Sequence, residues 1–147
     1  MTIAVWRDEY RTGHREIDQQ HQHLFKLVNH IHHLTQQALP DDVGIYAQLH
    51  EFASCAVAHF DLEESLMAQH DYPNLAIHCQ THRALVNKVQ TLLTKFDQTA
   101  ETQVVAVTQV LADWMVHHIR GEDQQMIRFL RACNAIEVGD SLLMTGP

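Results

Sequence analysis

Apolar side chains recur every three or four residues in four long stretches of this chain, which is the spacing of one face of an α-helix. The alternation of apolar and polar residues that would predict strands is absent. Short breaks rich in helix-ending residues separate the stretches, at 39–42, 71–74 and 97–102. Long helices joined by short connections pack as antiparallel neighbours. We therefore predict an all-α fold, an antiparallel up-down-up-down four-helix bundle with helices of roughly 19 to 30 residues.

The ends of the helices are predicted from residues that commonly cap them. The expected caps are Asp18 for the first helix, Asp41 or Asp42 for the second, Asn74 for the third, and Thr99 or Thr102 for the fourth. Gly121 should weaken the end of the fourth helix. We expect one domain over 1–136, with an N-terminal arm (1–17), the bundle (18–120) and a short C-terminal helix (122–133), followed by a tail or the start of a linker (137–147).

Each of the four inward stripes is apolar along most of its length and is interrupted by histidine or glutamate near one end. The interruptions come early in helices one and three and late in helices two and four. Because neighbours are antiparallel, these positions lie at the same end of the bundle and should form one polar layer. The predicted inward positions are Ile17, His21, Leu24, Val28 and Ile31; Leu49, Phe52, Ala56, His59, Glu63 and Met67; His78, His82, Leu85, Val89, Leu92 and Phe96; and Val104, Val107, Leu111, Met115 and His118.

This polar layer predicts a metal site. A single inward histidine is more often a hydrogen-bonded core residue than a ligand, and among 13 histidines one pair spaced by four is expected by chance. Two such pairs and two further histidines at one level are different, because burying them without partners would cost several kcal/mol each. The core stripes offer no lysine or arginine to pair with Glu63. The other histidines are expected on the surface: His14, His23, His30, His32, His33, His50, His70 and His117.

Composition narrows the class of protein. The chain has 147 residues and a formal net charge of -8, which fits one domain and argues against a nucleic-acid partner. No apolar run is long enough for a membrane span, and residues 1–8 show no secretory signal pattern. Cys55, Cys79 and Cys133 form no close pair and are expected to be buried or half-buried, in a reducing, cytoplasmic protein. The polar exterior favours a monomer.

Several motifs resemble the hemerythrin family over almost the whole chain. The stretch 13–21 (Gly-His-Arg-Glu-Ile-Asp-Gln-Gln-His) is similar to the family's entry into its first helix, and 59–64 (His-Phe-Asp-Leu-Glu-Glu) to its second-helix signature. His78 and His82 match the third-helix pair. The closing motif is matched by Trp114, His118, Ile119 and Asp123, and Trp6 fits the bacterial-type members.

The resemblance implies two iron ions bridged by an oxo or hydroxo group. By analogy, His78, His82 and His118 would hold one iron, and His21 and His59 the other. Glu63 and Asp123 would bridge the two ions. O2 would bind reversibly at the open position of the two-histidine iron, in an apolar pocket lined by Leu24, Phe60, Met115 and Ile119. Met115 departs from the leucine usual in the family, and a softer thioether there could change access to the pocket.

The second bridging carboxylate has two candidates, because His118 is followed by Glu122 four residues later and by Asp123 five residues later. The related iron–sulfur repair proteins use a glutamate at the first spacing, and the O2-binding members an aspartate at the second. We favour Asp123, because Ile119 and the His78/His82 pair resemble the O2-binding type. The choice requires the helix to deviate after His118, which Gly121 makes easier.

The sequence leaves the biological role open. O2 carriage, storage or delivery by a free-standing protein is one hypothesis. An O2- or redox-sensing input domain, coupled to a C-terminal signalling domain of a longer chain, is another. We expect no enzyme, although an iron–sulfur repair or peroxide-handling protein is the alternative from that class, and a zinc or manganese site is the alternative for the metal.

Overall fold

The computed structural model describes residues 3–39, 41–94 and 101–133, with 101–107 described by backbone alone. Its main elements are η1 (Asp8–Tyr10), α1 (Arg15–Thr35), α2 (Asp42–Gln69), α3 (Leu75–Thr94), α4 (Glu101–His118), the π-helical segment η3 (Ile119–Asp123) and α5 (Gln124–Ala132). No strand occurs among these described residues.

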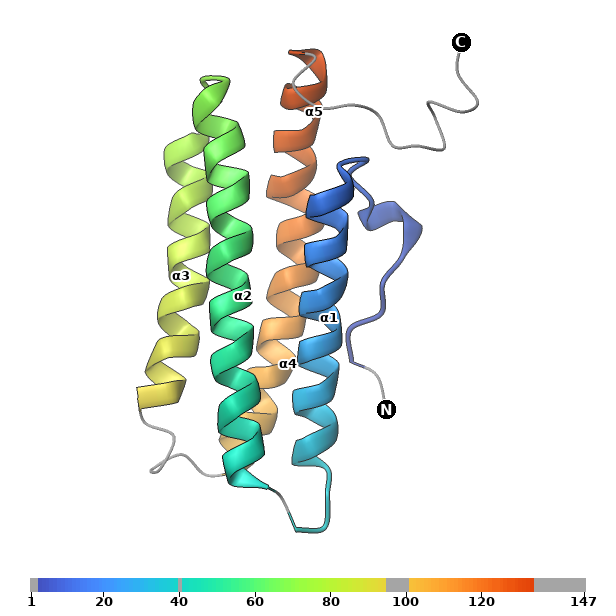
Figure 1. The fold of residues 1–147 in the computed structure, drawn as a ribbon, viewed down its shortest axis with the longest axis vertical. Coiled ribbons are helices and arrows are strands. Elements are labelled where there is room, and N and C mark those ends of the chain that lie inside the picture. Colours follow the sequence, from blue (N-terminus) through green and yellow to red (C-terminus); the bar gives the residue numbers. More distant parts are fainter. Residues whose placement is uncertain (1–2, 40, 95–100, 134–147) are drawn as a thin grey trace.

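The four long helices form the predicted antiparallel bundle (Figure 1). α1 and α3 run in one direction and α2 and α4 in the other. Each helix contacts two others, in the cyclic order α1, α2, α3, α4. α5 continues from α4 through η3, so the fourth column is longer than a single α-helix. None of the helices in the described ranges is both long and apolar enough to cross a lipid bilayer.

The polar layer lies between two apolar clusters. The larger cluster fills the bundle and includes Val28, Phe52, Val89 and Leu111. The smaller one lies at the other side of the layer and is formed by Ile17, Met67, Tyr72, Met126, Ile127 and Leu130. The predicted inward positions on the described side chains are all buried. Phe96, Val104 and Val107 lie outside the described side chains, as do the expected cap Thr99 and the tail 137–147.

The start of α1 differs from the prediction. The cap is His14, whose Nδ1 accepts a hydrogen bond from the backbone N–H of Ile17, so the helix begins at Arg15 and the arm ends before residue 17. Asp18 is therefore inside the helix. Its carboxylate accepts hydrogen bonds from the backbone N–H and hydroxyl of Thr12, at 2.8 Å each, and from the N–H of Gly13 at 3.2 Å. Asp18 thus serves the backbone before the helix and not the helix start itself.

The other helix ends agree with the prediction in part. Asp41 caps α2 by accepting from the N–H of Gly44, and α3 begins directly after Asn74. Thr102 is not a cap, since α4 begins at Glu101. The regular turns of α4 end at His118, and Gly121 lies in the π-helical η3 that follows, as expected of a residue that weakens the end of the fourth helix. The predicted short C-terminal helix is α5.

Two predictions about surface residues were wrong. His32 is buried, with 8% of its surface exposed, because it lies on the inner side of the last turns of α1. Cys133 is exposed at the end of α5, whereas Cys79 is buried and Cys55 half-buried as expected.

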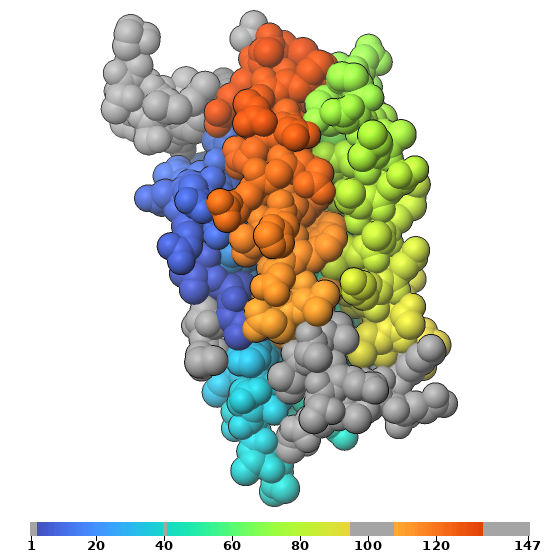
Figure 2. Space-filling model, turned by 180° about the vertical axis from the view of Figure 1, so that it is seen from behind, coloured from blue at the N-terminus to red at the C-terminus, as the bar shows by residue number. Residues whose placement is uncertain are grey.

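The arm packs along α1 and reaches the fourth column. Its backbone is held by Asn29, whose Oδ1 accepts from the N–H groups of Ile3 and Ala4 at 2.9 Å each. Farther along, η1 contacts η3, and an ion pair joins Glu9 to Arg120 at 3.7 Å. Seen from behind, α4 and its continuation run between the arm and α3 (Figure 2).

Candidate metal centre

All seven predicted ligand residues meet in one layer of the bundle. His21 comes from the start of α1, His59 and Glu63 from the second half of α2, and His78 and His82 from the start of α3. His118 ends α4, and Asp123 ends η3. None of the seven side chains has more than 3% of its surface exposed. The convergence inferred from the four stripes is thus a property of the structure.

The seven side chains form two groups that could each hold a metal ion. One consists of Glu63, His78, His82, His118 and Asp123, and the other of His21, His59, Glu63 and Asp123. Within each group the candidate ligand atoms all lie within 4.8 Å of one another. Both groups contain Glu63 and Asp123, so two carboxylates lie between two sets of imidazoles.

The spacing of these atoms suits ligands of a metal. Nε2 of His82 lies 3.0 Å from Nε2 of His118, and Nε2 of His118 lies 3.0 Å from Oδ1 of Asp123. In the second group, Nε2 of His59 is 3.0 Å from Oε2 of Glu63, and Nε2 of His21 is 3.1 Å from Oδ2 of Asp123. Two ligand atoms about 2.1 Å from an ion and at right angles to each other are about 3.0 Å apart.

Several of these close atoms do not point along hydrogen bonds. Nε2 of His21 and of His59, both carboxylate oxygens of Glu63 and Oδ2 of Asp123 are buried without a hydrogen-bond partner. The nearest nitrogen or oxygen atoms are close enough for hydrogen bonds, but the angles do not fit. The lone pairs of these atoms instead point towards shared positions between the side chains. Leaving buried polar atoms unsatisfied costs about 1–3 kcal/mol each. Ligation of cations would remove that cost, and the residues therefore fit a metal centre.

The outward nitrogens of three histidines are held by a second ring of polar side chains. Nδ1 of His59 lies 2.6 Å from Oε1 of Gln20, Nδ1 of His82 lies 2.8 Å from Oε2 of Glu64, and Nδ1 of His118 lies 3.4 Å from Oε1 of Glu122. A proton on each Nδ1, donated to these oxygens, leaves the lone pair on Nε2 directed inward. Gln20 and Glu64 were missed in the sequence, because only the register between helices reveals which histidine each one faces.

The η3 segment decides which carboxylate points inward. A π-helix takes an extra residue into its turn, so residues five apart lie on one face. Asp123 is fully buried among the imidazoles, whereas the side chain of Glu122 is 39% exposed and contacts the outer nitrogen of His118. This is the deviation after His118 that the choice of Asp123 requires.

The electrostatics of the layer favour charged groups in the metal-free protein. Burial alone would lower the pKa of His21, but Asp123 and Glu63 more than offset this and raise it to about 9. For His118, burial again lowers the pKa, but the Asp123 carboxylate more than offsets it and raises the pKa to about 10. Burial alone would raise the pKa of both carboxyl groups, yet the surrounding imidazoles hold both well below their usual range. The layer is thus a set of opposed charges that a cation would reorganise.

A small apolar cavity adjoins the layer. Its volume, counted as the space that the centre of a water molecule can occupy, is about 10 Å³. That is about the room needed for one water molecule. The four predicted pocket residues line it, together with residues that were not predicted for it; the lining consists of His21, Leu24, His59, Phe60, Leu85, Trp114, Met115, His118 and Ile119. The Phe60 ring stacks on His82 at 3.8 Å between centroids.

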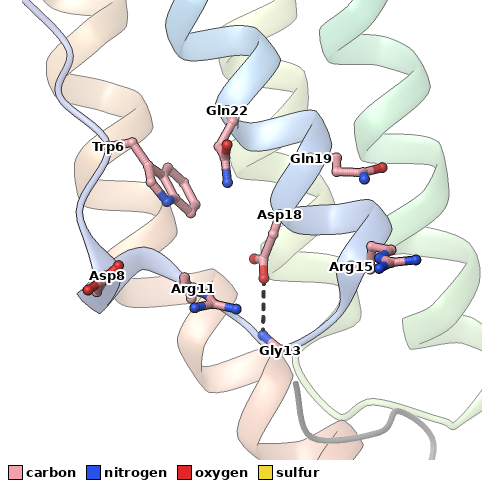
Figure 3. A pocket seen from close by; sticks show the side chains of 8 residues that line it. All are labelled: Trp6, Asp8, Arg11, Gly13, Arg15, Asp18, Gln19 and Gln22. Atoms are coloured by element: carbon pink, nitrogen blue, oxygen red, sulfur yellow. Dashed lines mark hydrogen bonds between the residues drawn. The ribbon is translucent and has the colours of Figure 1, made fainter. Parts of the chain in front are cut away.

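The arm covers the side of α1 that carries His21. The Trp6 ring lies 6.3 Å from the His21 ring and also packs edge-on against Phe25. Outside it, a separate pocket of about 350 Å³ lies between the arm and α1, lined by Trp6, Arg11 and other polar residues (Figure 3). Asp18 points across this pocket to Gly13, whose φ of 88° favours glycine. The Asp18 contact therefore fixes the arm where it joins α1.

Comparison with known proteins identifies the family that shares these features. The family model of the hemerythrin HHE cation-binding domain matches residues 12–130. The chain belongs to the hemerythrin family. The matched range includes all seven residues of the layer and excludes most of the arm.

Curated relatives agree with this assignment. A bacteriohemerythrin of Stenotrophomonas maltophilia is 31% identical over 84% of this chain and 79% of its own length. A bacteriohemerythrin of Pseudomonas aeruginosa is 28% identical over 89% of this chain and 84% of its own. A hemerythrin-like protein of Naegleria gruberi is 29% identical over 82% of this chain and 87% of its own length. A crystal structure of a point mutant superposes with a TM-score of 0.79 at 27% identity, covering 88% of this chain and 98% of that one.

Proposed function

We propose that this hemerythrin-family chain holds two iron ions and binds O2 reversibly beside them. His78, His82 and His118 would bind one ion, His21 and His59 the other, and Glu63 and Asp123 would bridge the pair, with an oxo or hydroxo group as the third bridge. The observation that carries this proposal is that two buried groups of donors share two carboxylates. A single ion would leave one set of imidazoles without a partner.

The inequality of the two groups supports an O2 site at the two-histidine ion. Apart from the shared carboxylates, one group supplies three imidazoles and the other only two, so the two-histidine ion keeps a free position. Both histidines of that smaller group, His21 and His59, line the apolar cavity, whereas the three-imidazole group contributes His118 alone to the lining. When bound, the ferrous pair supplies the electrons for reversible O2 binding, chemistry that the side chains lack.

The protein's own contribution is to exclude water and to control charge. Leu24, Phe60, Met115 and Ile119 are each at most 4% exposed and give the cavity an apolar wall. Two ferrous ions with two carboxylates and one hydroxide would carry about one net positive charge, which is far easier to bury than bare ions. Five neutral imidazoles among seven ligands disfavour the high-valent states that oxidise substrates, which supports binding over catalysis.

An absorption spectrum tests this proposal. The reduced, iron-loaded protein should gain a visible band on exposure to air and lose it again when O2 is removed under inert gas. Irreversible oxidation, or turnover of added peroxide faster than loss of the band, would favour the peroxide-handling alternative. Absence of any band with iron bound would refute O2 binding.

The cellular setting and role are part of the same proposal. Cys55, Cys79 and Cys133 are all free thiols, which supports a reducing, cytoplasmic setting. We propose a monomer, to be checked by sedimentation of the iron-loaded protein. Carriage or storage and sensing remain two candidate roles, and they differ in whether a signalling domain follows the bundle in the full reading frame.

A further inference from the structure

A second cluster of metal-ligating side chains lies outside the buried layer, on the outer face where α1 meets α2. It consists of His23 on α1 and of Glu51 and Cys55 on α2. One ring nitrogen, one carboxylate oxygen and the thiol sulfur all lie within 4.8 Å of one another. His23 and Glu51 are exposed and Cys55 is half-buried, so the cluster is open to solvent.

The packing of the two helices brings these residues together. α1 and α2 are antiparallel neighbours (Figure 1), and the contact between Gln20 and His59 fixes their register. His23 comes three residues after Gln20 on α1, and Cys55 comes four residues before His59 on α2. Because the helices are antiparallel, this register places His23 opposite Cys55. Glu51 precedes Cys55 by four residues and therefore shares its face.

Without a cation, the cluster keeps its thiol protonated. Sγ of Cys55 donates a hydrogen bond to Oε1 of Glu51 at 3.4 Å. Burial and the nearby Glu51 carboxylate raise the pKa of the Cys55 thiol. The Glu51 carboxylate, which accepts the hydrogen bond from the thiol, lies next to Sγ. It can therefore bind the same cation as the sulfur once the thiol has lost its proton.

We propose that His23, Glu51 and Cys55 form a surface site for one divalent cation of the zinc type, independent of the iron pair. Imidazole, carboxylate and thiolate are the three ligand types that Zn²⁺ takes in proteins, and a solvent molecule completes the tetrahedron. On binding, the Cys55 S–H bond breaks, the sulfur–metal bond forms and the proton goes to solvent.

The site needs only small movements to close. Tetrahedral ligand atoms about 2.0–2.3 Å from an ion are about 3.5 Å apart. This is roughly 1 Å less than the 4.8 Å within which the three ligand atoms of the cluster lie. The two exposed side chains can supply this by rotation. Because two helices contribute ligands, the bound ion would tie α1 to α2 beside the buried layer and stabilise the fold by linkage.

Cobalt titration of the iron-loaded protein tests the proposal, since a thiolate–cobalt bond gives a charge-transfer band in the near ultraviolet. The wild-type protein should show the band with one Co²⁺ per chain, and Zn²⁺ should remove it by competition. Cys55→Ser should abolish the band, whereas Cys133→Ser, which changes another accessible thiol, should leave it intact. His23→Ala should weaken Co²⁺ binding at least about tenfold. Mutation of residues that only hydrogen-bond to a metal ligand already lowers metal affinity by about 10- to 100-fold. His50→Ala, an exposed histidine one position before Glu51, should not weaken Co²⁺ binding.

In the cobalt titration, two outcomes would overturn the proposal: no band in the wild-type protein at saturating Co²⁺, or a band that survives Cys55→Ser. A measurement without substitution guards against misfolding of that variant. Zn²⁺ should slow alkylation of Cys55 in the wild-type protein but leave Cys133 reactive, and equal rates with and without Zn²⁺ would also refute the site. Neither result depends on whether the iron pair binds O2.

Discussion

Oδ1 of Asp123 lies 3.0 Å from Nε2 of His118, although the two residues are five positions apart on one helical column. In a regular α-helix five residues are about 1.4 turns, which would direct the carboxylate away from the histidine. The π-helical segment η3 absorbs one extra residue and returns Asp123 to the inner face. The backbone irregularity is thus tied to the assembly of the polar layer.

The two neighbouring carboxylates should therefore differ in their effect on metal binding. Asp123→Ala should lose one or both metal ions, because a buried carboxylate shared by both groups disappears. Glu122→Ala should keep both ions with at most a modest loss of affinity, since Glu122 contacts Nδ1 of His118, the nitrogen that faces away from the metal site. Metal content of the purified variants measures this. Loss of metal from the Glu122 variant alone would show that the bridge is assigned to the wrong residue.

The prediction of this layer from sequence succeeded because it needed only the period of each helix and the antiparallel order. The failures have a different origin. Asp18 has the residue type of a cap, but the helix is capped four residues earlier by His14, and Asp18 holds Thr12 and Gly13 instead. Gln20 and Glu64 sit beside predicted ligands, yet their roles depend on contacts between helices. Periodicity shows which face is inward, but it does not show which residue on the next helix is opposite.

Gly121 offers a test of whether η3 depends on glycine. A Cβ added there would meet no atom within 4 Å, and its φ is not positive. Gly121→Ala should therefore stabilise the protein by about 0.4–1 kcal/mol and leave metal content unchanged. Chemical denaturation of the metal-loaded variant measures this. A loss of metal in this variant would show that the π-helical turn requires glycine itself.

Gly44 is the matched control. It also lies in a helix, but an added Cβ would collide with the carboxylate of Asp41, which caps α2. Gly44→Ala should therefore gain little or lose up to about 1 kcal/mol, since displacing a cap costs that much. Equal stabilisation by both substitutions would mean that the cap is not strained by the new side chain.

Metal uptake should release protons near neutral pH. His21 and His118 have pKa values of about 9 and about 10 in the metal-free protein, so both are protonated at pH 7 and must lose a proton before Nε2 can bind a metal. Ferrous loading at pH 7 should therefore release at least these two protons, and the number should fall as the pH rises through 9 to 10. Anaerobic titration with a pH indicator in weak buffer measures the release.

The same groups set the stability of the metal-free protein. Because both pKa values are raised above the ordinary 6.5, their contribution is fully present below pH 6.5 and is lost as the pH rises through 9 to 10. His50→Ala removes an exposed histidine and should change neither the proton release nor this pH profile. Proton release that is independent of pH up to 10 would contradict the raised pKa values.

Met115 should control how long the O2-bound form survives. Its buried side chain lines the small cavity beside His21 and His59. Met115→Ala should enlarge the cavity, let additional water reach the ions and shorten the lifetime of the oxygenated protein several-fold, at a cost of about 2–5 kcal/mol in stability. Met115→Leu should change the lifetime with little loss of stability. Decay of the visible band in air measures the lifetime.

Met126 separates the effect of the cavity from the effect of stability. It is fully buried in the smaller apolar cluster, on the other side of the metal layer, and does not line the cavity. Met126→Ala should cost a similar stability but leave the decay of the oxygenated form close to that of the wild-type protein. If both alanine variants decay equally fast, general loosening of the bundle explains the loss. If only the Met115 variant decays faster, the apolar wall beside the two-histidine group protects the bound O2.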